Sequence, residues 1–343
     1  MRMLMFDEDF RILGEGLRGG VNLNSTSEPD ACANIRQCLE EIFANGIPPV
    51  IDKLYYVFVG QADMFLDALN GLTTVKETIA MSEPEAGLLA GALWRSGFVA
   101  LAGTGSDVFL ISEGRVPKVT IPDSRYIGNA FEAHTLRTVV GAWGPILGDD
   151  ASGSWIGQQA IRRAITGLEG WSEPTAILDM IREEWQLGQY WDMVETVYRS
   201  QAPFRKVASL TGIVGRAASG GDKVACDILK EAGRLMATQT LCLAGRFDVP
   251  AGDLRLVTCG GAWKSHPLMF RTFQSELALS RPDIQARLHG FEHIMAGPAR
   301  EMLEQSETRA GGARISGEQA ASLEKRMAEL FPAYVIHWSI DEI

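Results

Sequence analysis

Three segments of the chain combine glycines with hydroxyl, carboxyl or indole side chains, the residue types that hold phosphates and sugars. The first, Gly103–Ser106 (GTGS), stands between two apolar stretches. Glycines let a backbone approach a phosphate closely, and the hydroxyl groups add hydrogen-bond donors. The same four residues also suit an ordinary tight turn, and the segment by itself leaves both interpretations open.

The second segment, 143–153 (WGPILGDDASG), precedes a sequence with helical spacing. A carboxylate can accept hydrogen bonds from sugar hydroxyls and an indole can cover the apolar face of a sugar, so an Asp of this segment and the Trp beside it could bind one together. The free backbone amides at a helix N-terminus also hold polar ligands. The alternative is that Asp150 or Ser152 simply caps the helix.

The third segment, Cys259–His266 (CGGAWKSH), follows a strand-like run and precedes a helix with Pro267 in its first turn. Paired glycines at such a turn let a flat ligand lie against the backbone. Ordinary turn chemistry is again the alternative. We interpret Cys259 as a packed thiol, because no neighbouring residue marks it as a nucleophile.

The elements that must position these segments alternate between strands and helices, which favours an α/β architecture. Apolar runs predict strands at 3–6, 10–13, 54–59, 73–79, 98–102, 108–111 and 254–257, and a short one at 333–338. Helical spacing and capping signals predict helices at 29–43, 85–94 and 155–168, after Asp222, after Pro267, and at 318–330. Residues 117–137 have weak periodicity and are predicted to be an irregular insertion.

The composition is that of a folded, acidic protein. A length of 343 residues suits two domains or one large α/β unit. The chain has 32 Lys and Arg against 43 Asp and Glu, and the net charge of −11 makes nucleic acid and anionic membranes poor partners. No uncharged apolar run approaches the ~18 residues of a membrane span, and the start does not look like a signal peptide, so we expect a cytoplasmic protein.

Neither cysteines nor histidines predict a metal site. The five cysteines include no CxxC pair, which argues against a disulfide framework and against zinc. His289 and His293 have an i, i+4 spacing that can bind a metal, but no HExxH motif or nearby cysteine accompanies them. We therefore predict no protein-bound metal site.

The three segments, in chain order, resemble one family. ALAGTGS, WGPILGDDASGSWIGQQAIRRAI and TCGGAWKSHPLM look like the N-acetylglucosamine kinase branch of the BadF/BadG/BcrA/BcrD ATPase family, and EGLRGGVNLNS is similar to the GGPANYNS segment of that family. The resemblance covers residues 4–305. It implies the α/β fold of actin and sugar kinases, a two-domain, ribonuclease H-like architecture with a ligand cleft between the domains.

The resemblance also implies domain boundaries. Residues 1–96 correspond to the N-terminal domain, completed by the helix at 316–331, and residues 97–315 to the C-terminal domain with the GTGS hairpin and an adenosine turn. The family begins with a strand and a DGGGTKT hairpin, which holds the β- and γ-phosphates and organises Mg²⁺. This sequence contains no DGGGTKT, and its first residues align with the family's segment directly after that hairpin. Either the start lies further upstream or the protein does not hydrolyse ATP.

The family's site residues carry over to matching positions of this chain. The resemblance implies that the sugar is bound by Asn22, Ser106, Trp143 and Asp149. It implies that ATP, with Mg²⁺, is bound by Gly103, Thr104, Gly105, Ser106, Gly260, Gly261 and Lys264.

Glu83 stands where the family has its catalytic Asp. The match is MSEPEAGLLAGAL against SDAEAALAGAL. Either carboxylate could accept the proton of a sugar hydroxyl, although Glu is one methylene longer and small displacements change rates strongly. The alternative is a carboxylate that only stabilises a helix start.

Three functions stay open at this point. The first is ATP-dependent phosphorylation of N-acetylglucosamine or a related amino sugar. The second is a non-catalytic sugar- or nucleotide-binding pseudokinase, which Glu83 and the missing hairpin favour. The third is a dehydratase-activating ATPase with an iron–sulfur cluster, for which the cysteines lack a cluster-like spacing. A small-molecule sugar and ATP are the expected partners, and a homodimer is compatible with all three.

Overall fold

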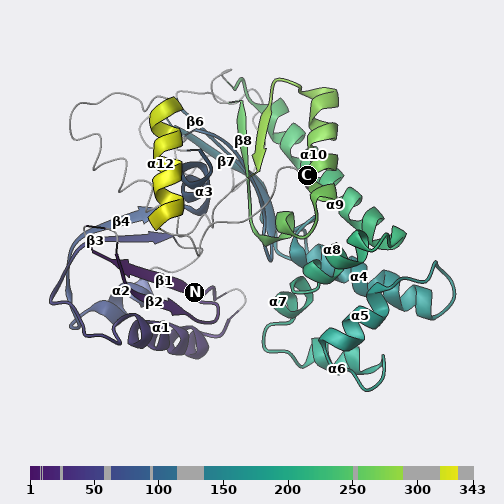
Figure 1. Ribbon diagram of the computed structural model, residues 1–343, viewed down its shortest axis with the longest axis horizontal. Coiled ribbons are helices and arrows are strands. Elements are labelled where there is room, and N and C mark those ends of the chain that lie inside the picture. Colours follow the sequence, from purple (N-terminus) through teal and green to yellow (C-terminus); the bar gives the residue numbers. More distant parts are fainter. Residues whose placement is uncertain are drawn as a thin grey trace. The chain divides into compact units, whose positions relative to one another are not determined.

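The computed structural model describes residues 1–330, apart from 8, 10, 24–25, 58–62, 93–95, 114–134, 250–253 and 289–316. The chain forms two compact units, one of residues 1–93 and 291–336 (unit 1) and one of residues 94–290 and 337–343 (unit 2). Each unit has strands and helices of its own (Figure 1). The predicted strand at 333–338, His289 and His293 lie outside the described residues.

The described strands of unit 1 form two pairs. Strand β1 (Arg2–Phe6) is antiparallel to β2 (Ile12–Leu17), and β3 (Val50–Val57) is parallel to β4 (Thr74–Met81). The helices of this unit are α1 (Glu28–Ile42), α2 (Asp63–Leu69), α3 (Glu83–Ala92) and α12 (Gly317–Leu330). The two strand pairs, α1 and α12 can be followed in Figure 1.

Helix α1 shows how local sequence builds unit 1. Ser27 caps it by accepting a hydrogen bond from the Asp30 amide, and Pro29 occupies the first turn, where no amide partner is needed. Its apolar positions Ile35 and Leu39 recur at helical spacing and are buried against Phe65 of α2. Residues of β1, α1 and α2 therefore share one small core.

Unit 2 is built on a five-stranded sheet with the order β7-β6-β5-β8-β9. Strands β5 (Gly97–Ala102), β6 (Ser106–Glu113) and β7 (Thr135–Gly141) form an antiparallel meander, and β8 (Arg255–Cys259) and β9 (Gln285–Leu288) continue the sheet in parallel. All six residues of β5 are buried, as its central place in the sheet requires. The last three residues of the predicted irregular insertion, 135–137, belong instead to β7, because they pair with β6; the rest of that insertion lies outside the described residues.

The helices of unit 2 fill the chain between these strands. They are α4 (Gly153–Leu168), α5 (Ile177–Glu184), α6 (Asp192–Tyr198), α7 (Pro203–Ala208), α8 (Thr211–Ser219), α9 (Lys223–Arg246), the 3₁₀ helix η2 (Gly261–Lys264) and α10 (Pro267–Ser280). Asp222 caps α9 through the Ala225 amide, as the sequence predicted. Leu168, the last residue of α4, is 49 % exposed.

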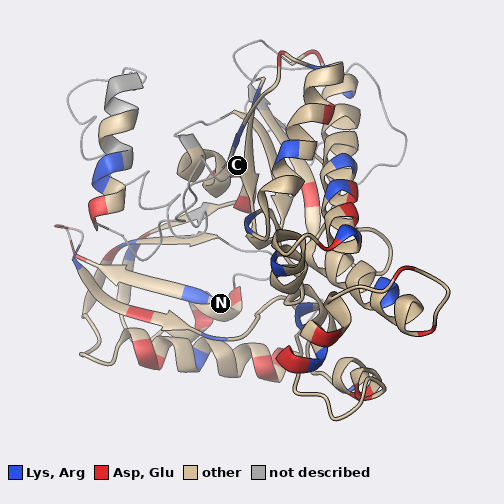
Figure 2. Cartoon of the chain, turned by 45° about the vertical axis from the view of Figure 1, so that its right-hand side comes forward, with Lys and Arg blue, Asp and Glu red and all other residues tan. Residues whose placement is uncertain are grey.

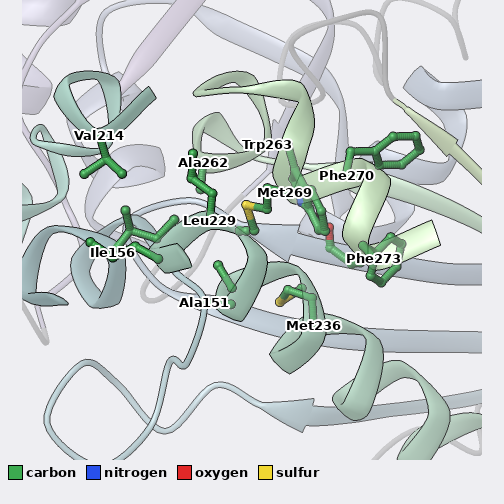
Figure 3. Close-up of a cluster of buried hydrophobic side chains, with 14 of the residues drawn as sticks. Ala151, Ile156, Val214, Leu229, Met236, Ala262, Trp263, Met269, Phe270 and Phe273 are labelled. Atoms are coloured by element: carbon green, nitrogen blue, oxygen red, sulfur yellow. The ribbon is translucent and has the colours of Figure 1, made fainter. Parts of the chain in front are cut away.

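The second and third predicted ligand segments both pack into the hydrophobic core of unit 2. Figure 3 shows Ala151 from the second segment and Ala262 and Trp263 from the third in the same cluster as Ile156, Leu229 and Phe273. The Trp263 indole donates a hydrogen bond to the Ala100 carbonyl of β5 at 3.0 Å. Each of these two segments is therefore fixed to the core by buried residues.

Figure 2 shows Lys and Arg interspersed with Asp and Glu along the described helices. Within the described part of the chain, no helix combines the length and apolar character that a membrane crossing needs.

Candidate functional site

The first three residues of the GTGS segment, 103–105, connect β5 and β6 in a hairpin, as the sequence predicted, and Ser106 begins β6. Ala102 pairs with Ser106, and the Gly103 amide donates to the Gly105 carbonyl at 2.9 Å across the turn. A Cβ atom on Gly105 would lie 2.6 Å from Oδ2 of Asp149. A larger residue at this position would have to displace the Asp149 carboxylate, which occupies the space beside the Gly105 Cα.

The loop of residues 142–152, which joins β7 to α4, and the first residues of α4 are hydrogen-bonded to this hairpin. The Gly153 amide donates to the Gly103 carbonyl at 2.7 Å, and the Ser154 amide donates to the Thr104 carbonyl at 3.2 Å. The Ser106 hydroxyl donates to the Asp150 carbonyl at 2.7 Å. The first two predicted segments are therefore hydrogen-bonded to each other, although Ser106 and Asp150 are 44 residues apart in the sequence.

The structure decides which residue caps α4. The Ser152 hydroxyl accepts a hydrogen bond from the Trp155 amide at 3.0 Å, which is the usual cap geometry. Asp150 is exposed and contributes its backbone carbonyl instead. Asp149 is thus not needed to begin the helix.

Asp149 is a buried carboxylate in an unfavourable backbone conformation. It is 6 % exposed, has a φ of +56°, and its Oδ1 accepts a hydrogen bond from the Gly144 amide at 3.0 Å. Burial raises the pKa of this carboxyl, while hydrogen bonds from the backbone of Gly144 and Ser106 oppose that shift. A carboxylate that carries both a desolvation penalty and a strained φ is typical of ligand-binding positions.

Strain is concentrated in this loop. Of the four non-glycine residues with positive φ in the described chain, three belong to it: Ala142, Asp149 and Ala151. Each left-handed non-glycine residue costs about 1–3 kcal/mol, so other contacts must hold the loop. The buried side chain of Ala151 and the bonds to the hairpin provide that support.

The tip of the loop is apolar and exposed. Trp143 is 52 % exposed, and Ile146 and Leu147 are 80 % and 78 % exposed. The Cβ of Trp143 lies 3.0 Å from where a Cβ on Gly148 would be, so the indole stem packs on the Gly148 backbone. An exposed indole beside a buried carboxylate is the combination that the sequence predicted for a sugar contact.

The third segment lies against the base of the GTGS hairpin. Gly260 has a φ of +100°, and a Cβ there would be 2.4 Å from the Ala102 carbonyl oxygen. Gly261 is exposed, and a Cβ at that position would meet no atom within 4 Å. The two glycines therefore differ: Gly260 lets the turn approach the hairpin, whereas Gly261 leaves open backbone for a ligand. Lys264 is exposed at the end of η2.

His266 has a structural role at the start of α10. Its Nδ1 accepts a hydrogen bond from the Leu268 amide at 3.1 Å. Burial, with a further contribution from the Arg271 charge, lowers the pKa of this imidazole. The neutral ring is the form that can accept this bond.

The two remaining predicted residues, Asn22 and Glu83, belong to unit 1. The Asn22 carbonyl accepts a hydrogen bond from the Thr26 amide at 2.9 Å in the loop that leads to α1. Glu83 is the first residue of α3, where a capping box already exists: the carboxylate of Glu85 accepts from the amide and hydroxyl of Ser82 at 2.9 and 2.6 Å. Capping of α3 therefore falls to Ser82 and Glu85.

A nucleotide fits the described residues better than a protein-bound metal does. No group of three His, Cys, Asp or Glu capable of holding a metal occurs in the described part of the chain. Mg²⁺ in phosphoryl-transfer sites is held largely by substrate phosphates and water, so such a group is not required. The hairpin at Gly103 and the open backbone at Gly261 offer the close approach that a nucleotide needs.

Sequence reasoning missed two side chains that hold the loops in place. Gln239 of α9 donates from Nε2 to the Asp150 carbonyl at 3.3 Å, and Asn34 of α1 donates from Nδ2 to the Gly20 carbonyl at 2.9 Å. Neither stands in a glycine-rich segment or a recognisable motif. Their partners are 89 and 14 residues away in sequence, so no local spacing identifies them.

The chain has the α/β fold of actin-like sugar kinases. A solved putative N-acetylglucosamine kinase from Chromobacterium violaceum matches with a TM-score of 0.56 and 17% identity, over 87% of this chain and 94% of that chain. A putative N-acetylglucosamine kinase from Porphyromonas gingivalis matches with a TM-score of 0.57 and 15% identity, over 88% and 94%. At these identities the likeness concerns the fold.

One curated relative is similar to this chain in amino-acid sequence. An N-acetylmuramic acid/N-acetylglucosamine kinase of Clostridium acetobutylicum is 25% identical over 288 residues, which cover 81% of this chain and 86% of that protein. No protein-family model matches the chain. Sequence and fold thus both lie near sugar kinases.

Proposed function

We propose that this protein is an ATP-dependent kinase of an amino sugar, N-acetylglucosamine or a close relative, of the BadF/BadG/BcrA/BcrD type. The observation that carries the proposal is the Asp149 carboxylate, buried in a strained loop and placed directly over Gly105 of the hairpin. In this proposal the buried Asp149 carboxylate binds the sugar, and the hairpin backbone beside it binds the phosphates of ATP. The two ligands would therefore lie next to each other. The similarity to the kinase of Clostridium acetobutylicum supports the same substrate class.

Each predicted residue has a role in this proposal. Asp149 accepts hydrogen bonds from sugar hydroxyls, Trp143 covers an apolar face of the sugar, and Asn22 adds a polar contact. The residues proposed to bind ATP are Gly103, Thr104, Gly105, Ser106, Gly260, Gly261 and Lys264. The Ser106 hydroxyl already holds the Asp150 carbonyl, so this serine also maintains the shape of the loop.

The proposed reaction is a phosphoryl transfer. The oxygen of a sugar hydroxyl bonds to the γ-phosphorus of ATP, the bond from that phosphorus to the bridging oxygen breaks, and ADP leaves. The Glu83 carboxylate accepts the hydroxyl proton as general base. Mg²⁺ bound with ATP supplies neutralisation of the phosphate charge. The remaining contribution of the chain is to position the hydroxyl, mainly through Asp149.

The test is a substrate panel with the purified chain. N-acetylglucosamine, N-acetylmuramic acid, glucosamine and glucose are each incubated with Mg·ATP, and sugar phosphate and ADP are quantified by mass spectrometry. We expect phosphorylation of the N-acetylated sugars in preference to glucose. If calorimetry detects sugar binding but no sugar leads to ADP formation, the protein is a non-catalytic sugar-binding protein and the kinase proposal is wrong. The Glu in place of the family's Asp favours that alternative.

A further inference from the structure

The loop that carries Asp149 needs restraints from outside itself, because Ala142, Asp149 and Ala151 all have positive φ. At its far end, the loop is held through the Asp150 carbonyl oxygen. Two side chains donate to that one atom: the Ser106 hydroxyl at 2.7 Å and the Gln239 amide at 3.3 Å. Ser106 comes from the hairpin and Gln239 from the middle of α9, so the carbonyl is fixed from two directions.

Gln239 also contacts the other end of the loop. Its Oε1 is buried, has no hydrogen-bond partner among the described residues, and lies 3.0 Å from where a Cβ on Gly141 would be. Gly141 is the last residue of β7 and has a φ of +93°, at the point where the loop leaves the sheet. The single amide of Gln239 therefore lies against both the beginning and the end of the loop.

The orientation of this amide is determined by its partner. The Asp150 carbonyl is an acceptor, so it requires the NH₂ group of the amide; the reversed amide would bring two oxygens together. That requirement directs Oε1 toward Gly141, where a side chain larger than hydrogen would collide with it.

We propose that Gln239 is a positioning residue, which keeps the Asp149 carboxylate at the sugar-binding position by a hydrogen bond to the Asp150 carbonyl at one end of the loop and by close packing near Gly141 at the other. The expected effect of Gln239 on activity rests on the proposed sugar kinase function, whereas its effect on the loop does not. Displacement of a binding group by about 1 Å can reduce rates on the order of 10²-fold. The described contacts of Gly260 and Gly261 do not involve Gln239, so the proposed adenosine turn after β8 is not affected.

The experiment compares Gln239→Leu and Gln239→Glu with a control on the same helix, Thr238→Val. Leu removes the donor, and the carboxylate of Glu presents only acceptors to the Asp150 carbonyl. Thr238 is exposed, and its hydroxyl donates to the Arg234 carbonyl within α9. For each protein, hydrogen exchange of the amides at 143–149, kcat, and the KM values for sugar and for ATP are measured.

We expect faster exchange of the loop amides in both Gln239 variants and a fall of kcat/KM for the sugar by roughly 10- to 100-fold. The KM for ATP should rise less than the KM for the sugar, because the turn at Gly260 and Gly261 does not contact Gln239, and Thr238→Val should match wild type throughout. Unchanged exchange in the loop, or equal effects on the KM values for sugar and ATP, overturns the role assigned to Gln239. A wild-type protein that phosphorylates no sugar overturns the proposed function, and the exchange data then decide independently whether Gln239 holds the loop.

Discussion

At the scale of single residues, Asp149 lowers the stability of the folded state and is also a residue proposed to bind the sugar. Its backbone is in the left-handed region, and burial raises the pKa of its carboxyl above the usual 3.8. The folded state therefore binds this proton more tightly than the unfolded chain does. This group favours folding below about pH 3.8 and opposes it as the pH rises through its folded pKa.

Replacement of Asp149 by Asn should separate these two effects. Asn carries no charge to desolvate and tolerates positive φ, so the unfolding free energy at pH 7 should not fall. The kcat/KM for the sugar should fall on the order of 10²–10⁴-fold, because a charged acceptor for hydroxyls is lost. Urea denaturation and steady-state kinetics measure the two quantities.

The adjacent variant Asp150→Asn is the matched control, because the exposed side chain of Asp150 is not used by the loop. It should resemble wild type in both assays. Full activity of Asp149→Asn would remove Asp149 from the sugar site, and loss of folding would return it to a purely structural role.

Glu83 is the residue proposed to accept the proton, and its substitution should affect chemistry more than binding. In Glu83→Gln we expect kcat to fall by about 10²–10⁴-fold while the dissociation constant of the sugar changes little, because a base acts in the transition state. Glu85→Gln is the control, since Gln also satisfies a capping box. A kcat within threefold of wild type in Glu83→Gln would assign the base to another residue.

At the scale of elements, the two adjacent glycines in the turn after β8 differ in the space around them. Gly260 has no room for a Cβ atom, whereas Gly261 has open space. Gly260→Ala should lower the unfolding free energy by at least about 1–2 kcal/mol, because the new Cβ meets the Ala102 carbonyl at positive φ. Gly261→Ala should fold normally, since its Cβ has open space, but raise the KM for ATP. Thermal unfolding and kinetics distinguish them. Equal stability of both variants would contradict the geometry of this turn.

His266 makes the start of α10 sensitive to pH. Its pKa is lowered in the folded state, so the unfolded chain binds this proton more tightly. The contribution of the cap is fully present above the unfolded pKa of 6.5 and is lost as the pH falls below it. His266→Asn keeps a cap that does not titrate.

Relative to His266→Asn, wild type should therefore lose stability between about pH 7.5 and pH 5.5. Unfolding free energies of both proteins at the two pH values check this expectation. A constant difference between them would show that protonation of His266 does not act on the cap.

At the scale of the whole molecule, two units have separate cores. Unit 1 is built around Ile35 and Phe65, and unit 2 around Phe98 and Trp263. All the predicted nucleotide-binding residues and Asp149 belong to unit 2, while Asn22 and Glu83 belong to unit 1.

Ligand binding should stabilise the folded molecule through linkage. At 100 times its dissociation constant, a sugar that binds only the folded state adds about 2.7 kcal/mol to the unfolding free energy. We expect N-acetylglucosamine to raise the Tm of wild type and of Glu83→Gln, but not of Asp149→Asn at the same concentration. Differential scanning calorimetry measures these shifts, and an equal rise in Asp149→Asn would place the sugar elsewhere.

Local sequence determined most of the elements and the three segments of the candidate site. Helical spacing, the cap at Asp222 and the glycine hairpin all act within a few residues, so they can be recognised without knowing the fold. The same reasoning left the α4 cap open between Asp150 and Ser152, because either side chain has suitable chemistry there.

Only the tertiary structure decided how the segments meet. It chose Ser152 as the cap, placed the Asp149 carboxylate over Gly105, and directed Gly260 toward the hairpin backbone. It also brought Gln239 to Asp150 across 89 residues of sequence. These contacts depend on sheet pairing and on packing of the long helix against the strands, and such long-range geometry leaves no signal in the spacing of neighbouring residues.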